Sequence, residues 1–119
     1  MRYLLIIAHG SRREQANEEI RALASSIADH SANRYDATRH AFLELTQPTI
    51  AEAIDDCVAE GANSIVVLPY FLSMGNHVAK DIPEIIQQKR KQYPEMEIEL
   101  KDYFGRQSEI HDLIVQASN

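Results

Sequence analysis

Residues 3–11 read YLLIIAHGS, and residues 65–77 read IVVLPYFLSMGNH. Each stretch begins with a continuous apolar run, and the loop after that run contains a histidine, His9 or His77. Apolar runs without polar alternation are typical of strands that are covered on both faces, as at the centre of a parallel sheet. Because ligands bind outside the carboxyl ends of such strands, the two histidines are candidates for one ligand site.

The rest of the chain alternates between strand and helix patterns. We expect strands at 2–8, 35–44, 64–70 and 96–103, and helices at about 12–30, 47–60, 77–92 and 107–117. This alternation predicts an α/β fold with a four-stranded parallel sheet, right-handed crossovers and helices on both faces. Ser11 is followed three residues later by Glu14, which fits a capping box, so Ser11 is expected to be the N-cap of the first helix.

The strand patterns also predict the order of the strands. The runs at 2–8 and 64–70 are continuously apolar and belong at the centre of the sheet. Residues 35–44 and 96–103 alternate between apolar and polar side chains and belong at its edges. The flavodoxin-like order 2-1-3-4 satisfies both conditions, and the strand order reverses between the first and third strands. The two histidines follow those two strands.

Composition limits the class of protein and its partners. The chain has 119 residues, a formal net charge of −6 and 45% hydrophobic residues. Its length predicts one domain covering 1–119, and its negative charge argues against nucleic acid as a partner. The first apolar run is too short for a membrane span or a signal-peptide core. The single cysteine, Cys57, lies on the apolar face of its predicted helix and leaves no internal disulfide, so a cytoplasmic location is expected.

Three side chains at the predicted ligand site could handle a metal ion or a proton. A neutral imidazole, with a reference pKa of about 6.5, ligates divalent metals or accepts a proton. His9 and His77 are therefore candidate metal ligands and catalytic residues. Glu44 ends the second strand at the same edge, where it could be a third ligand, a partner that orients a histidine, or a base. The alternatives are loop histidines that bond to backbone groups and a solvated carboxylate.

Two further segments could contact a substrate. Ser11, Arg12 and the first amide groups of the following helix form a candidate anion site, because a helix N-terminus presents free N–H groups and a positive dipole. The loop before His77 could be a lid or a simple connection between strand and helix. Its residues are Ser73, Met74, Gly75 and Asn76. The chain has no G-x-G-x-x-G, Walker A, C-x-x-C or G-x-S-x-G motif, which argues against dinucleotide, phosphate-transfer, thiol-redox and serine-hydrolase chemistry.

Three blocks of residues resemble the short CbiX/SirB-type class II chelatases. They are His9-Gly10-Ser11-Arg12 with Asn17-Glu18, Ala41-Phe42-Leu43-Glu44 with Pro48, and Pro69-Tyr70-Phe71-Leu72 with Gly75, His77, Val78 and Asp81-Ile82-Pro83. Together the blocks cover most of the chain, in the order and at the spacing that the family shows.

The resemblance implies a lyase that inserts a divalent metal into sirohydrochlorin, Co²⁺ for cobalamin or Fe²⁺ for sirohaem. The metal is then a substrate, no cofactor is permanently bound, and short members pair as homodimers. His9 and His77 would be catalytic and would bind the metal together with Glu44. The carboxylates of the tetrapyrrole would meet donors such as Ser11 and Arg12 and the loop before the second histidine. The ligand types do not distinguish cobalt from iron or nickel.

The last block departs from the family pattern. Family members usually carry a proline-leucine-glycine stretch near the last strand and then a histidine-proline pair, whereas residues 103–108 here read YFGRQS. Only Gly105 is clearly retained, and Gln107 stands where the histidine is expected. The altered segment Phe104–Ser108 motivates an alternative, a tetrapyrrole or metal carrier that has lost chelatase activity. A third possibility is a flavodoxin-like anion-binding protein with no metal role.

Overall fold

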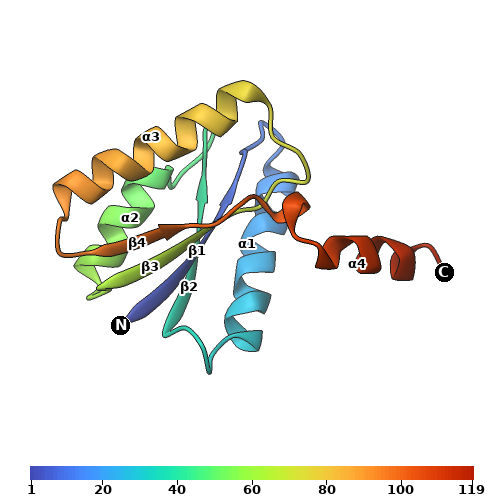
Figure 1. Cartoon of the computed structure of the whole chain (residues 1–119), viewed down its shortest axis with the longest axis horizontal. Coiled ribbons are helices and arrows are strands. Elements are labelled where there is room, and N and C mark those ends of the chain that lie inside the picture. Colours follow the sequence, from blue (N-terminus) through green and yellow to red (C-terminus); the bar gives the residue numbers. More distant parts are fainter.

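Four parallel strands form one sheet in the order β2-β1-β3-β4, as the sequence predicts. The computed structural model describes residues 1–119 and is drawn in Figure 1. The strands are β1 (Arg2–Ala8), β2 (Ala37–Phe42), β3 (Ser64–Pro69) and β4 (Glu97–Leu100). The helices are α1 (Glu14–His30), α2 (Ile50–Ala59), α3 (Asn76–Gln92) and α4 (Glu109–Ala117), with a short 3-10 helix η1 (Phe104–Arg106).

The central strand β1 is buried on both faces because its alternate side chains enter two different cores. Tyr3, Leu5 and Ile7 belong to a cluster of 14 buried residues that includes side chains of α2 and α3. Leu4 and Ile6 belong to a smaller cluster on the side of α1. Figure 1 shows α1 on the opposite side of the strands from α2 and α3. A strand between two layers of helices has no solvated face, which explains its unbroken apolar run.

The pairing of β1 with β2 continues beyond both strands into the loops that carry candidate site residues. Ala8 lies opposite Phe42 in the register of the two strands. The backbone N–H of Leu43 then donates to the carbonyl of Ala8 at 2.9 Å, and that of Glu44 donates to the carbonyl of His9 at 3.1 Å. The sheet itself therefore sets His9 and Glu44 side by side.

The first helix begins later than the sequence predicts, and the prediction that Ser11 is its N-cap is wrong. Helix α1 begins at Glu14, the capping position is Arg13, and no side chain caps the helix. The hydroxyl of Ser11 instead accepts a hydrogen bond from the backbone N–H of Arg13 at 3.0 Å. Because the hydroxyl satisfies an N–H group two residues onward, the chain makes a short turn before the helix.

Helix α2 also begins later than predicted, because its capping box lies at Thr49. The Thr49 hydroxyl accepts from the N–H of Glu52 at 3.2 Å, and the Glu52 carboxylate accepts from the N–H of Thr49 at 2.9 Å. Pro48 therefore precedes the helix. Pro83, by contrast, lies inside α3, where it removes one backbone N–H from the helical ladder.

The C-terminal segment leaves the sheet. Strand β4 ends at Leu100, earlier than predicted, and β2 is likewise shorter than predicted. Beyond η1, helix α4 projects from the rest of the molecule (Figure 1), and its Leu113, Ile114 and Val115 are exposed. None of the helices combines the length and the apolar character that crossing a bilayer requires.

Candidate functional site

His9 and Glu44 form a pair at the carboxyl end of the central strands. The Nε2 atom of His9 lies 2.8 Å from Oε1 of Glu44. The two side chains are 50% and 57% exposed, so the pair faces solvent. The ring of His9 also makes an edge contact with Phe71 in the loop after β3, with ring centroids 6.2 Å apart. The structure thus places Glu44 as the hydrogen-bond partner of a histidine, one of the three arrangements that the sequence left open.

Gly10 allows the loops of this pair to approach each other. Its φ angle of +95° lies in the left-handed region, which glycine adopts without strain. A Cβ atom at this position would lie 1.9 Å from the carbonyl oxygen of Glu44. The backbone after β1 therefore packs directly on the backbone after β2, and the geometry of the His9–Glu44 pair depends on this contact.

His77 lies in the first turn of α3 and pairs with Asp81, one turn further along. Its Nε2 atom lies 2.9 Å from Oδ2 of Asp81, and the histidine side chain is 87% exposed. Residues four apart on a helix lie on the same face, so this pairing follows from the spacing. Asp81 is not among the predicted site residues, although its spacing of four residues from His77 is a signal that points to it.

One cavity joins the two histidine–carboxylate pairs. Its volume is about 250 Å³. It is lined by His9, Leu43, Glu44, His77, Asp81, Glu84, Ile85 and Gln88. The structure thus brings the three candidate metal ligands to the same cavity. It does not place three or more histidine, cysteine or carboxylate side chains close enough to hold an ion together, so the ligands stand as two separate pairs.

Each pair contains the groups needed to exchange a proton for a metal ion. An ionised carboxylate can only accept a hydrogen bond, so in a neutral ring the proton lies on Nε2, the nitrogen beside the carboxylate oxygen. If the ring proton moves to Nδ1, Nε2 becomes free to bind a divalent ion, and the neighbouring oxygen can bind the same ion. Imidazole and carboxylate ligands of this kind suit first-row metals such as cobalt and iron.

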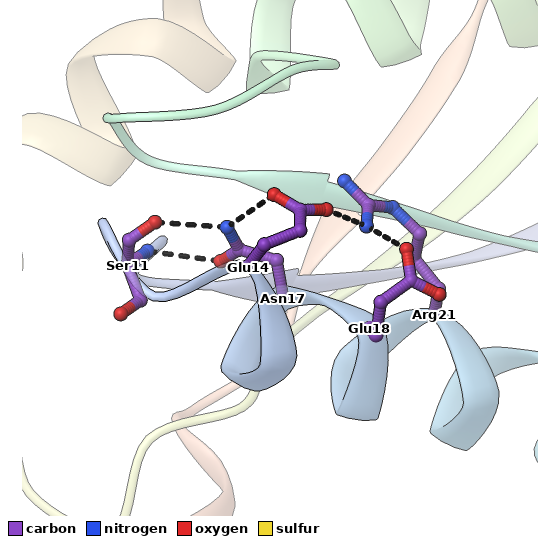
Figure 2. A network of polar contacts seen from close by, with 5 residues as sticks. All are labelled: Ser11, Glu14, Asn17, Glu18 and Arg21. Carbon is purple, nitrogen blue, oxygen red and sulfur yellow. Dashed lines mark hydrogen bonds and ion pairs between the residues drawn. The ribbon is translucent and has the colours of Figure 1, made fainter.

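Ser11 and Arg12 lie in the loop between His9 and α1. Figure 2 shows that the backbone of Ser11 faces the side-chain amide of Asn17, which bonds to both its N–H and its carbonyl group. The Ser11 N–H group is therefore already used. Arg12 is exposed, so its guanidinium is the more accessible of the two predicted anion contacts.

The predicted substrate loop before His77 is partly helical. Asn76 is the first residue of α3, and Gly75 precedes it. Met74 packs against the main core, whereas Ser73 is exposed. The loop is thus anchored by one side chain and presents the others beside the histidine.

Three exposed apolar side chains near this edge of the sheet are not among the predicted site residues. Leu45 follows β2 and is 55% exposed, while Tyr70 and Leu72 follow β3 and are 38% and 72% exposed. Since β2 and β3 flank β1, these residues lie in the loops on either side of the His9 loop. Leu45 has a φ angle of 71°, a left-handed conformation that costs a non-glycine residue about 1–2 kcal/mol. Such strain is concentrated at functional sites.

The segment Phe104–Ser108, whose sequence departs from the family pattern, supports the loop after β3. The N–H of Gly105 donates to the carbonyl of Phe71 at 2.8 Å. A Cβ atom on Gly105 would lie 1.8 Å from the carbonyl oxygen of Leu72. The retained glycine therefore has a packing role, because only a residue without a side chain lets the two segments approach this closely.

Gln107, which stands where the family histidine is expected, lies outside the cavity of the two pairs. Its side-chain amide donates to the carbonyl of Asp102 at 3.2 Å. The ring of Phe104 packs against Tyr70, with centroids 5.7 Å apart. The segment thus acts on the site through the loop that it supports.

Two other residues that could do chemistry lie elsewhere. Cys57 is in the main core, and burial raises the pKa of its thiol to about 12, so the thiol stays protonated. His40 packs against Phe42 on β2, and burial, together with Arg21 and Arg39, lowers the pKa of its imidazole below the ordinary value. The side chain of His40 is half-buried.

The CbiX family model matches residues 3–119 of the chain. A sirohydrochlorin cobaltochelatase of Methanococcus aeolicus is 37% identical over 86 residues, which are 72% of this chain and 59% of that protein. Another, from Saccharolobus islandicus, is 30% identical, and the match covers 98% of this chain and 92% of that protein. A sirohydrochlorin ferrochelatase of Priestia megaterium is 31% identical, and the match covers 98% of this chain and 43% of that protein.

A solved structure shows the same fold. The sirohydrochlorin chelatase SirB from Bacillus subtilis, in complex with cobalt, superposes with a TM-score of 0.85 at 30% sequence identity. The match covers 98% of this chain and 49% of that chain. The chain thus spans nearly the whole of some relatives and about half of others.

Proposed function

The chain belongs to the CbiX family, and on this premise we propose that it inserts a divalent metal ion, cobalt or iron, into sirohydrochlorin. The observation that carries the proposal is the cavity that joins the pair His9–Glu44 to the pair His77–Asp81. Relatives named sirohydrochlorin cobaltochelatase and sirohydrochlorin ferrochelatase support the substrate and both metals.

Metal insertion exchanges two protons for one ion. Two pyrrole N–H bonds of the macrocycle break, both protons leave, and the four ring nitrogens bind the ion. The carboxylates of Glu44 and Asp81 lie 2.8 and 2.9 Å from the histidine nitrogens. In these positions they can accept protons as the imidazoles of His9 and His77 bind and release the ion.

The arrangement suits transfer of an ion better than storage of one. A closed site with four protein ligands is typical of structural metals, whereas catalytic sites keep positions open. Here each pair is solvent-accessible and offers one nitrogen and one carboxylate. The exposed Leu45 and Leu72 would contact the apolar surface of the macrocycle, and Arg12 would meet its carboxylates.

Anaerobic absorbance spectroscopy tests the proposal. Purified protein is mixed with sirohydrochlorin and either Co²⁺ or Fe²⁺, and the spectrum of the macrocycle is followed in time. We expect at least one ion to be inserted at a rate proportional to the protein concentration. Saturable binding of sirohydrochlorin with no acceleration of insertion by either ion would contradict the chelatase and favour the carrier.

A symmetric homodimer is the second part of the proposal, and helix α4 supports it. Ile110, Leu113, Ile114 and Ala117 recur at helical spacing and form an apolar stripe along α4. Leu113 and Ile114 are 52% and 60% exposed. An exposed apolar stripe on a projecting helix is a feature that a partner normally covers.

A groove beside α4 offers a place for the helix of a second copy. Its volume is about 1170 Å³. Apolar side chains from β1 and β3 line it, and the cationic groups of Arg2, Arg34 and Lys101 stand around them. The first turn of α4 carries Glu109 and Asp112. Two copies that exchange α4 would bring these opposite charges together twice, once in each half of a self-complementary interface.

Replacing Ile114 by aspartate is expected to weaken dimerisation by at least about 30-fold, or about 2 kcal/mol, because a charge would enter an apolar contact. Gln116→Asp is the matched control, since it adds the same charge to the opposite face of α4. Light scattering over a concentration series, with insertion rates measured in parallel, gives the answer. A wild-type monomer with full specific activity at nanomolar concentration would refute the dimer.

The location and the remaining partners stay predictions from the sequence. They are a cytoplasmic location, no permanently bound cofactor, and no nucleic-acid or membrane partner.

A further inference from the structure

Asn17 on α1 is the one buried polar residue beside the loop that carries His9. Its side chain is only 2% exposed. The Oδ1 atom accepts from the backbone N–H of Ser11 at 2.9 Å, and the Nδ2 atom donates to the carbonyl of Ser11 at 2.8 Å (Figure 2). A carboxamide carries an acceptor and a donor side by side, so it matches both backbone groups of one residue at once.

The two hydrogen bonds between Asn17 and the backbone of Ser11 form a clamp two residues from His9. The residue between His9 and Ser11 is held by a second contact. At Gly10 the backbone packs on the carbonyl of Glu44. The loop is thus fixed at two successive residues, first against the chain after β2 and then against α1. The direction in which the His9 side chain leaves the sheet depends on both contacts.

The polar network around Asn17 extends toward the strand that carries the partner of His9. The Nδ2 atom of Asn17 also lies 3.4 Å from the carboxylate of Glu14. Arg21 forms ion pairs with both Glu14 and Glu18, and the pairing with Arg21 lowers the pKa of Glu14 below its ordinary value. Figure 2 shows these side chains in one row along α1. The guanidinium of Arg21 lies over the ring of Phe42 on β2, 5.5 Å from its centroid.

Phe42 is fully buried and lies two residues before Glu44. The network therefore contacts both chain segments of the His9–Glu44 pair, one through Asn17 and the other through Arg21. Of these two connections, the Asn17 clamp is buried and has two short hydrogen bonds, so it constrains the loop more strongly.

We propose that Asn17 is a positioning residue, which fixes the His9 loop and thereby sets the affinity of the site for its divalent metal substrate. This inference rests on the proposed function, because it concerns the same pair of side chains. Asn17 touches neither the metal nor the macrocycle. It acts through the backbone of Ser11 and through the orientation of His9.

Replacing Asn17 by alanine is expected to weaken binding of Co²⁺ by about 10- to 100-fold, the usual effect of removing a group that orients a metal ligand. The KM for the metal should rise by a similar factor, and by clearly more than the KM for sirohydrochlorin, to which Arg12 in the same loop also contributes. A residue with a purely structural role would not divide the two substrates in this way. Titration with Co²⁺ alone, followed by visible absorbance well below the melting temperature, measures the affinity without turnover.

Two further variants separate positioning from loss of stability. Thr38→Ala is the matched control, because Thr38 is also a buried polar residue on the α1 side and bonds to Ser31 away from the site. It should lower the melting temperature but leave the affinity for Co²⁺ unchanged. Asn17→Asp keeps the size of the side chain and the acceptor for the Ser11 N–H, but it sets an oxygen against the Ser11 carbonyl. If the alanine variant does not fold, the aspartate variant should still show weaker binding of Co²⁺.

Equal affinities for Co²⁺ in wild type, the folded Asn17 variant and Thr38→Ala would overturn the role of Asn17. A wild-type protein that shows no saturable binding of Co²⁺ would overturn it as well. If the wild type binds Co²⁺ but inserts neither cobalt nor iron, the chelatase proposal fails on its own, and the titration still decides whether Asn17 positions His9.

Discussion

Replacing His9 or His77 by alanine is expected to lower the rate of metal insertion by at least about 100-fold, because each change removes one of the two nitrogen ligands that we propose at the cavity. Removing a group that only orients a ligand costs about 10- to 100-fold in affinity or activity. Loss of the ligand itself should be at least as severe. The measurement is the anaerobic insertion rate with Co²⁺ and with Fe²⁺.

Both variants should fold normally. The side chains of His9 and His77 are 50% and 87% exposed, so neither contributes much to a core. Exposed substitutions of this kind usually change the free energy of unfolding by no more than about 0.5 kcal/mol. Glu19→Ala is the control, since Glu19 is exposed on α1 and lines neither the site cavity nor the groove beside α4. A near-wild-type insertion rate in either variant would remove that histidine from the mechanism.

The order of the strands could be predicted because the burial of a strand on one or both faces determines the pattern of its apolar residues. β1 and β3 are covered on both faces, so they are apolar throughout, whereas the edge strands alternate. The same argument brought His9 and His77 to one edge of the sheet, and the structure places both at one cavity. The two histidines, which lie at one cavity in the fold, were thus identified from apolar runs that are far apart in the sequence.

The beginning of α1 shows where local patterns mislead. Ser11 and Glu14 have the spacing of a capping box, yet the structure uses the serine hydroxyl for Arg13 and the backbone of Ser11 for Asn17. A tertiary requirement, the fixed path of the His9 loop, prevails over the local motif. Thr49 has the same spacing to Glu52 without a competing partner, and there the capping box forms.

The partners of the site residues could not be predicted with the same ease, because they depend on where side chains point. Asp81 is a neighbour of His77 only if α3 begins before both, whereas Pro83 favours a later start because proline is normally tolerated only in a first turn. The packing of Gly105 on Leu72 joins segments more than 30 residues apart and leaves no periodic signal. Such tertiary contacts determine the geometry of the site, whereas the periodicity of the sequence predicts only where in the fold the site lies.

Replacing Gly10 by alanine is expected to disturb the geometry of the His9–Glu44 pair. An alanine Cβ would lie 1.9 Å from the carbonyl oxygen of Glu44, so one of the two loops has to move. The left-handed φ of +95° adds strain, which for a non-glycine residue is about 1–2 kcal/mol. We expect a lower melting temperature and a loss of insertion of at least about 10-fold, because displacing Glu44 alters the partner of His9, a proposed metal ligand.

Gly61→Ala separates the two causes. Gly61 also has a left-handed φ, +105°, but it follows α2 at the opposite edge of the sheet, and a Cβ there meets only the flexible end of Met1 at 3.2 Å. The strain is therefore similar, and no site residue is displaced. Gly61→Ala should lower the melting temperature and keep its insertion rate at temperatures where the protein is folded. If Gly10→Ala keeps its rate as well, the contact between the loops does not shape the site; if only Gly10→Ala loses it, the close approach of the two backbones is what holds the His9–Glu44 pair in place for the metal.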